Sequence, residues 1–265
     1  MLKDITIGQY YPTGSVIHKL DPRSKLFITF SLIVGLFIID KFLAYGIIIS
    51  FILMATIVSK IPIGYMTKGL RPLMFIIIIT FLINMFMTTG EVIYTVGPLN
   101  VTREGLSQAI FMALRLILLV IGTSLLTLTT TPIQLTDGIE YMLNPFRRIG
   151  VPAHELAMMM TIALRFIPTL LEETDKIMKA QIARGADFES GNILSRAKSL
   201  VPLLVPLFIS AFRRADDLAM AMEARCYRGG ENRTRMKELK MTGKDSISMA
   251  ITGIMLILLI YTRIM

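Results

Sequence analysis

Long stretches with almost no charge dominate this chain and limit what it can fold into. Four lie in its first half and a fifth lies near its end: 26–39, 42–58, 73–87, 109–128 and 246–261. With its flanks, each is near the roughly 17 to 25 residues that a helix needs to cross a bilayer. The chain is 54% hydrophobic and only 18% charged, which is far from the balance of a soluble domain. We therefore expect an all-α integral membrane protein.

Charge divides the chain into three parts. Residues 131–245 carry 17 of the 28 Lys and Arg residues and 14 of the 19 Asp and Glu residues, so this section is expected to lie mostly in water. We expect an N-terminal cytoplasmic segment and four transmembrane helices in 1–130. A cytoplasmic helical section follows in 131–245, and a last transmembrane helix in 246–265. No cleavable signal peptide is apparent, so the first span should be retained.

Basic residues also predict the orientation. Seven of them flank the first three runs on one side: Lys3, Lys19, Arg23, Lys25, Lys60, Lys68 and Arg71. The opposite turns carry two basic and three acidic residues. By the positive-inside rule, the N-terminus and residues 131–245 are cytoplasmic. The net charge of +9 is then explained by basic loops beside anionic lipid, so we expect the lipid bilayer as a partner and no nucleic acid.

Two long helices are predicted in the charged section, because apolar positions recur at helical spacing in 155–182 and in 200–222. Pro168, Pro202 and Pro206 should kink these helices or start them. Upstream, Thr136 and Asp137 suggest the N-cap of a short helix that ends before Asn144. Residues 150–152, Gly-Val-Pro, predict the turn into the first long helix.

The two long helices end alike. Asp175, Ala180, Ala183 and Arg184 recur 41 residues later as Asp216, Ala221, Ala224 and Arg225. We call Ala183, Arg184 and Gly185 the first tip, and Ala224, Arg225 and Cys226 the second tip. Gly185 can adopt the left-handed conformation that ends a helix. A lone arginine here would only offset the helix dipole. Two matched tips favour a partner with two equivalent grooves, such as a dimer of nucleotide-binding subunits.

Several motifs together resemble those of one transporter family. They are Leu20-Asp21-Pro22-Arg23-Ser24-Lys25, Asn144-Pro145, Val151-Pro152, Leu164-Arg165-Phe166-Ile167-Pro168 and the two tips. The chain resembles, over nearly its whole length, the transmembrane coupling subunit (T component) of energy-coupling factor (ECF) transporters for vitamins and transition metals. The tips match that family's two X-Arg-X coupling motifs.

This resemblance implies a role without catalysis in a prokaryotic cell membrane. Arg184 and Arg225 would each dock into one of two ATP-binding cassette subunits, identical or different, with Ala183, Gly185, Ala224 and Cys226 as supports. The helices that bear the tips would couple ATP use by these partners to a substrate-binding S component, and the chain itself would need no cofactor. Cys226 stands where the family often has glycine, so the second tip is expected to end its helix less sharply.

Two other classes of function remain as alternatives. An intramembrane prenyl or lipid transferase would need an Asp-rich metal motif, such as paired D-x-x-x-D repeats, which the sequence lacks. A channel or conventional permease would need polar residues in its spans or inverted repeats. A Walker-type phosphate loop is also missing, so the chain is not expected to be the ATPase. Cys226 is the only cysteine and the two histidines are far apart, so we expect no catalytic or metal site.

A few polar residues have open interpretations. Arg115 lies in the fourth apolar run, either in a functional pathway or bonded to carbonyls at a helix interface. Asn84 should form a hydrogen bond across helices, and His18 and His154 should be cap or loop residues. The adjacent acidic pairs at 172–173 and 216–217 fit a solvated face or partners for the arginines at 213–214. The basic stretch 225–235 is expected to extend the partner surface.

Overall fold

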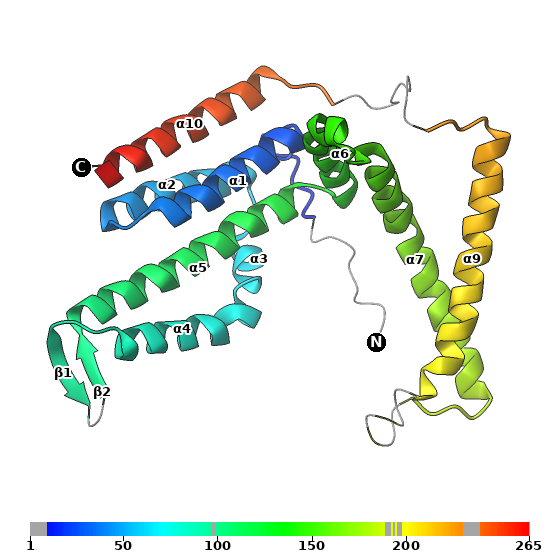
Figure 1. Ribbon diagram of the computed structural model, residues 1–265, viewed down its shortest axis with the longest axis horizontal. Coiled ribbons are helices and arrows are strands. Elements are labelled where there is room, and N and C mark those ends of the chain that lie inside the picture. Colours follow the sequence, from blue (N-terminus) through cyan, green and yellow to red (C-terminus); the bar gives the residue numbers. More distant parts are fainter. Residues whose placement is uncertain are drawn as a thin grey trace. The chain divides into compact units, whose positions relative to one another are not determined.

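The computed structural model describes residues 10–96, 99–188, 192, 194, 198–229 and 239–264. Helices make up nearly all of the regular structure, which confirms the all-α prediction (Figure 1). In chain order the elements are α1 (Pro22–Ile38), α2 (Phe42–Ser59), α3 (Ile63–Lys68), η2 (Arg71–Leu73), α4 (Met74–Met87), β1 (Val92–Val96), β2 (Leu99–Thr102), α5 (Arg103–Thr129), α6 (Pro132–Leu143), η3 (Asn144–Ile149), α7 (Ala153–Ala183), α9 (Val201–Ala224) and α10 (Gly243–Ile264). The described residues form two compact units, one from 10–138 with 239–264 and one from 139–229.

The first unit is a bundle in which α1 packs against α5 and α10, and α2 against α5 and α10. Its core is a cluster of buried apolar side chains that includes Leu36, Ile48 and Leu259. Tyr45 is buried in the same cluster, and its hydroxyl donates to the Phe111 carbonyl (3.3 Å). Apolar side chains on the outer sides of these helices are exposed. That pattern fits a bundle surrounded by lipid, since lipid tails solvate apolar side chains as well as a protein core does.

Five segments of the described chain are long and apolar enough to cross a membrane: Phe42–Ser59, Ile63–Met87, Arg103–Thr129, Ala153–Ala183 and Gly243–Ile264. Four of them contain runs predicted to span. The set differs from the prediction at two places, because α1 has only 17 residues and is not included, whereas α7 is included. Residues 131–245, which include α7, were expected in the cytoplasm because this section carries most of the charged residues of the chain. The first half of α7 is apolar enough to bring the whole helix into the membrane-spanning class.

Arg115 caps a neighbouring helix. Its Nη2 donates to the carbonyl of Ile39 (2.9 Å), the C-cap residue of α1, and its guanidinium lies 5.8 Å from the Phe37 ring centroid. The last carbonyls of a helix lack partners within the helix, and an arginine is a favourable donor to them. Of the two interpretations left open by the sequence, the contacts therefore favour the structural one.

Among the residues that the structure describes, Asn84 bonds within its own helix and not across helices, so that prediction is wrong. Its Nδ2 donates to the Thr80 carbonyl (2.8 Å), one turn earlier in α4. Close contact between α4 and α5 is achieved instead by Gly105, where an added Cβ would lie 2.8 Å from the Met85 carbonyl oxygen. The link between these helices is a two-stranded antiparallel hairpin, β1–β2, which the sequence analysis did not predict (Figure 1).

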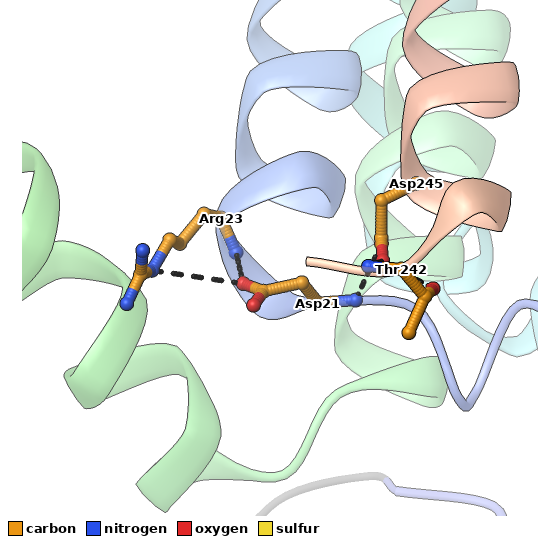
Figure 2. A network of polar contacts seen from close by, with 4 residues as sticks. All are labelled: Asp21, Arg23, Thr242 and Asp245. Carbon is orange, nitrogen blue, oxygen red and sulfur yellow. Dashed lines mark hydrogen bonds and ion pairs between the residues drawn. The ribbon is translucent and has the colours of Figure 1, made fainter. Parts of the chain in front are cut away.

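The motif at the start of α1 is bonded to the start of α10 (Figure 2). Asp21 caps α1 by accepting from the Arg23 backbone N–H (2.9 Å), while its own N–H donates to Oδ1 of Asp245 (2.7 Å) in the first turn of α10. Oδ2 of Asp245 accepts from the backbone N–H and the hydroxyl of Thr242 (2.8 and 2.7 Å). Two helix starts that are 224 residues apart are thus joined by one carboxylate. This part of the family motif has a structural role in the described contacts.

His18 is a buried loop residue, in line with the sequence expectation. One ring nitrogen lies 2.8 Å from the Tyr11 carbonyl oxygen and the other 2.8 Å from the Ser15 hydroxyl. Burial, together with the nearby charge of Lys25, lowers the pKa of His18 below its ordinary value of 6.5. The imidazole is therefore neutral at pH 7 and serves to order the segment before α1.

The short helix α6 ends before Asn144 as predicted, but its start was predicted wrongly. Thr136 lies inside the helix, and its hydroxyl donates to the Pro132 carbonyl (2.9 Å). The helix begins one turn earlier, where the Thr131 hydroxyl accepts from the Gln134 N–H and the Gln134 side chain accepts from the Thr131 N–H. This reciprocal pair, with proline at the first helical position, is a capping box.

Candidate coupling site

Both long helices form as predicted. Helix α7 runs from Ala153 to Ala183 after a turn at Gly150, whose φ is 94°, and α9 runs from Val201 to Ala224. Pro202 lies in the first turn of α9, where its missing N–H is no loss. Pro168 and Pro206 lie inside continuous helices. Neither of these two prolines therefore ends its helix.

Helices α7 and α9 pack against each other in opposite directions (Figure 1). Near the end of α7, the Gln181 side chain donates to the Pro202 carbonyl (3.3 Å) at the start of α9. At the other end, Tyr227, just beyond α9, contacts Met158 near the start of α7. Residue numbers thus rise along one helix as they fall along the other. The pair is antiparallel.

A charged pair joins the two helices at their crossing. Nη2 and Nε of Arg214 donate to Oε2 of Glu173 (2.9 and 3.2 Å), and the Ser210 hydroxyl donates to Oε1. This confirms an acidic residue of the 172–173 pair as a partner for an arginine of the 213–214 pair. Glu173 and Arg214 are also 41 residues apart, the same offset that relates the tips. Residues that match by the repeat and touch each other indicate an approximate two-fold axis through this contact.

The two tips end their helices with the same backbone geometry. At the first tip, the N–H of Gly185 donates to the Ile182 carbonyl and the N–H of Ala186 to the Gln181 carbonyl, both at 2.9 Å. At the second tip, the corresponding bonds run from Cys226 to Glu223 (2.8 Å) and from Tyr227 to Met222 (3.0 Å). This pair of bonds defines the Schellman motif. The repeat found in the sequence is therefore a repeat of conformation too.

Cys226 corrects the expectation that the second tip ends its helix less sharply. Its φ is 55°, in the left-handed region, as the φ of Gly185 is at 88°. A side chain in this conformation is disfavoured by roughly 1–2 kcal/mol. The second tip therefore ends its helix as sharply as the first tip does, and the strained conformation of Cys226 lowers the stability of the protein.

Replacing Cys226 by glycine is expected to stabilise the protein. Cys226→Gly removes the left-handed strain but adds chain entropy to the unfolded state, so we expect a net gain of about 0.5–1 kcal/mol in the free energy of unfolding. The midpoint of thermal unfolding in detergent measures the change. Gly185→Ala is the matched control and should lower that midpoint. A lower midpoint for Cys226→Gly would contradict the strain.

The structure brings the residues of each tip together but keeps the tips apart. All six tip residues are exposed. The first tip lies beside the start of α9 and the second tip follows its end, so the length of α9 separates them. Its 24 residues at 1.5 Å each give about 36 Å. Two exposed arginines thus lie at opposite ends of one pair of helices.

Two residues, Tyr227 and His154, form a side-chain contact at the second tip that the sequence did not predict. Tyr227 directly follows Cys226, and its hydroxyl lies 3.4 Å from Nε2 of His154. His154 is the second residue of α7, and its Nδ1 lies 3.1 Å from Oε1 of Glu140 in α6. The only sequence signal was position, since the residue two places after a Schellman C-cap often packs back on its neighbours.

The bundle also contains an apolar cavity of about 270 Å³, lined by parts of α1, α2, α5 and α10. Five polar residues reach its wall: Lys25, Thr29, Thr129, Ser248 and Thr252. Each already donates to a backbone carbonyl, Lys25 to two of them. The polar groups of the wall therefore already have hydrogen-bond partners, so the cavity suits a hydrocarbon better than a polar nutrient.

Comparison with known proteins decides the family. The family model CbiQ, described as cobalt transport protein, matches residues 13–236. The "Energy-coupling factor transporter transmembrane protein EcfT" of Thermosediminibacter oceani is 66% identical over 262 residues, which cover 99% of each chain. Proteins of the same name in Clostridium kluyveri and Bacillus subtilis are 61% and 48% identical, covering 98% or more of each chain. The chain belongs to the EcfT family.

Membership of the EcfT family confirms the resemblance inferred from the motifs. It makes the chain a multi-pass membrane component of an ECF transporter, in keeping with its five segments that can span a bilayer. It does not favour the intramembrane transferase or the conventional permease. The family match extends from residue 13 through both tips, so it includes α7, α9 and the contact between them.

Proposed function

We propose that this EcfT-family chain transmits motion from two partner ATPase subunits to a substrate-binding S component, and that the partners alone hydrolyse ATP. The observation that carries the proposal is the pair of exposed tips. Each presents an arginine at the end of a Schellman-capped helix, about 36 Å from the other by the length of α9. A dimer of ATP-binding cassette subunits would offer one groove to each tip.

The crossed helices suit such a transmission. A guanidinium offers a planar fork of donors for carboxylates or carbonyls in a partner groove. When nucleotide closes the ATPase dimer, the distance between its grooves changes, and the tips would move with them. Because α7 and α9 are held together at Glu173 and Arg214, that displacement would turn one helix against the other. An S component packed on these helices would then be tilted or released.

The cargo is assigned to the S component on this proposal. The cavity of the bundle has an apolar wall whose five polar residues are already bonded, so little in it would recognise a vitamin or a metal ion. The proposal keeps residues 131–245 in the cytoplasm, as the positive-inside rule predicts, so that α7 does not cross the membrane although its length and composition would allow it.

Purification from the native membrane tests the proposal. We expect a tagged chain to bring down two ATP-binding cassette subunits, identical or different, and a small membrane protein. ATP hydrolysis should be found in the complex and lost from the chain once the partners are stripped off. A homo-oligomer of this chain that has enzymatic activity of its own would refute the proposal.

A further inference from the structure

A side-chain tether fastens the second tip to the start of α7. The hydroxyl of Tyr227 donates to Sδ of Met158 (2.9 Å) and lies within hydrogen-bond distance of Nε2 of His154 (3.4 Å). His154 and Met158 are four residues apart and so share one face of α7. Tyr227, the residue after the second tip, therefore contacts the first turns of α7.

The tether continues into α6. Nδ1 of His154 lies 3.1 Å from Oε1 of Glu140, which belongs to the last turn of α6. The side chains of His154 and Glu140 are 29% and 14% exposed, so water screens this contact only in part. Tyr227, His154 and Glu140 thus form one chain of polar contacts that joins α9, α7 and α6.

The first tip has no equivalent of Tyr227. The residue 41 places earlier is Ala186, whose methyl group cannot form a hydrogen bond. Near the first tip the contact between helices comes from Gln181, which lies inside α7 three residues before Arg184. The two tips share a backbone conformation, therefore, but the second has an additional side-chain anchor beyond its helix end.

We propose that Tyr227 is a positioning residue for Arg225, and that its contacts with His154 and Met158 carry displacements of the second tip into α7 and α6. The Schellman bonds fix the backbone at the helix end, but they lie within the end of α9 and do not hold it against α7. The tether holds that end against α7. A force on Arg225 then moves α7 and α6 with α9 instead of bending the last turn. The part that concerns ATPase force rests on the proposed function.

The single cysteine makes the tether directly measurable. Cys226 is exposed and lies between Arg225 and Tyr227, so a nitroxide spin label on it reports the mobility of the second tip. With the full chain in lipid nanodiscs, we expect Tyr227→Phe to raise that mobility clearly while the thermal unfolding midpoint stays within a few degrees. His154→Ala should act in the same direction through a different atom. An unchanged label mobility in both variants would overturn the proposal.

Two controls separate the tether from a general loss of order. Tyr94→Phe makes the same chemical change at an exposed residue of β1 and should leave the label unaffected. Exchanging the residues of the two equivalent positions, as Cys226→Gly with Gly185→Cys, moves the label to the first tip. Tyr227→Phe should not change its mobility there. An equal increase at both tips would show that the tyrosine stabilises the whole helix pair, and would also overturn the proposal.

A coupled assay tests transmission. In vesicles that contain the chain with its ATPases and an S component, Tyr227→Phe should lower nutrient uptake per ATP hydrolysed by threefold or more without loss of subunits. If nutrient uptake and ATP hydrolysis both fell by the same factor, the result would argue against a role of Tyr227 in transmission. The label measurement needs no ATPase, so its outcome stands apart from the proposed function, which the purification and the variants of the tip arginines test separately.

Discussion

Charge reversal at either tip is expected to lower nutrient uptake by about tenfold or more. Arg184→Glu and Arg225→Glu each replace five N–H donors by a carboxylate that would repel acidic groups in a partner groove. Because the tips lie at opposite ends of the helix pair, neither arginine can substitute for the other. Uptake and the amount of co-purified ATPase, measured in membranes with equal amounts of the chain, give the result.

Three further variants sharpen this test. Arg213→Glu makes the same charge change at an exposed position of α9 away from the tips and should leave assembly nearly unchanged. Arg184→Lys and Arg225→Lys should be milder than the reversals, since lysine keeps the charge but lacks the planar fork. Normal uptake in both Glu variants would remove the basis for the coupling role.

Local features of the site could be predicted from the sequence. Helical spacing located both long helices to within two residues at each end, because a period of 3.6 is distinctive over more than twenty residues. The 41-residue repeat located the tips, and the glycine at position 185 predicted a residue in the left-handed conformation. The conformation of Cys226 could not be predicted from its type. It follows from the hydrogen bonds to Glu223 and Met222 that the residues around it form.

Contacts between helices could not be predicted from the sequence. The sequences of α7 and α9 do not predict that the two helices run antiparallel. The separation of the tips could therefore be seen only in the structure. Tyr227 shows the same limit, since a tyrosine after a helix end is common and its partners are about 70 residues away. Thr131 could have been found, because T-x-x-Q with proline between is a capping signal. Thr136 and Asp137 are N-cap residue types too, so residue type alone does not decide between the two helix starts.

Breaking the crossing of α7 and α9 is expected to lower transport, though by less than the loss of a tip. Arg214→Glu places two carboxylates together at the contact, and Glu173→Arg places two guanidinium groups there. Each should lower the free energy of unfolding by about 1 kcal/mol, since the pair is partly exposed. The effect on uptake should be several-fold, because the two helices would lose the contact about which they turn against each other. Uptake and the thermal unfolding midpoint measure the two effects.

The double exchange Glu173→Arg with Arg214→Glu decides between a local ion pair and a symmetric pivot. If an approximate two-fold axis passes through the contact, swapping the charges restores the pair, and more than half of the lost uptake should return. Ser210 would then lie beside a guanidinium, which keeps the recovery incomplete. Lys179→Glu, which reverses one charge of the exposed Asp175–Lys179 pair within α7, should have little effect. A double variant no better than the singles would show that the geometry of Glu173 and Arg214, rather than their opposite charge, holds the crossing.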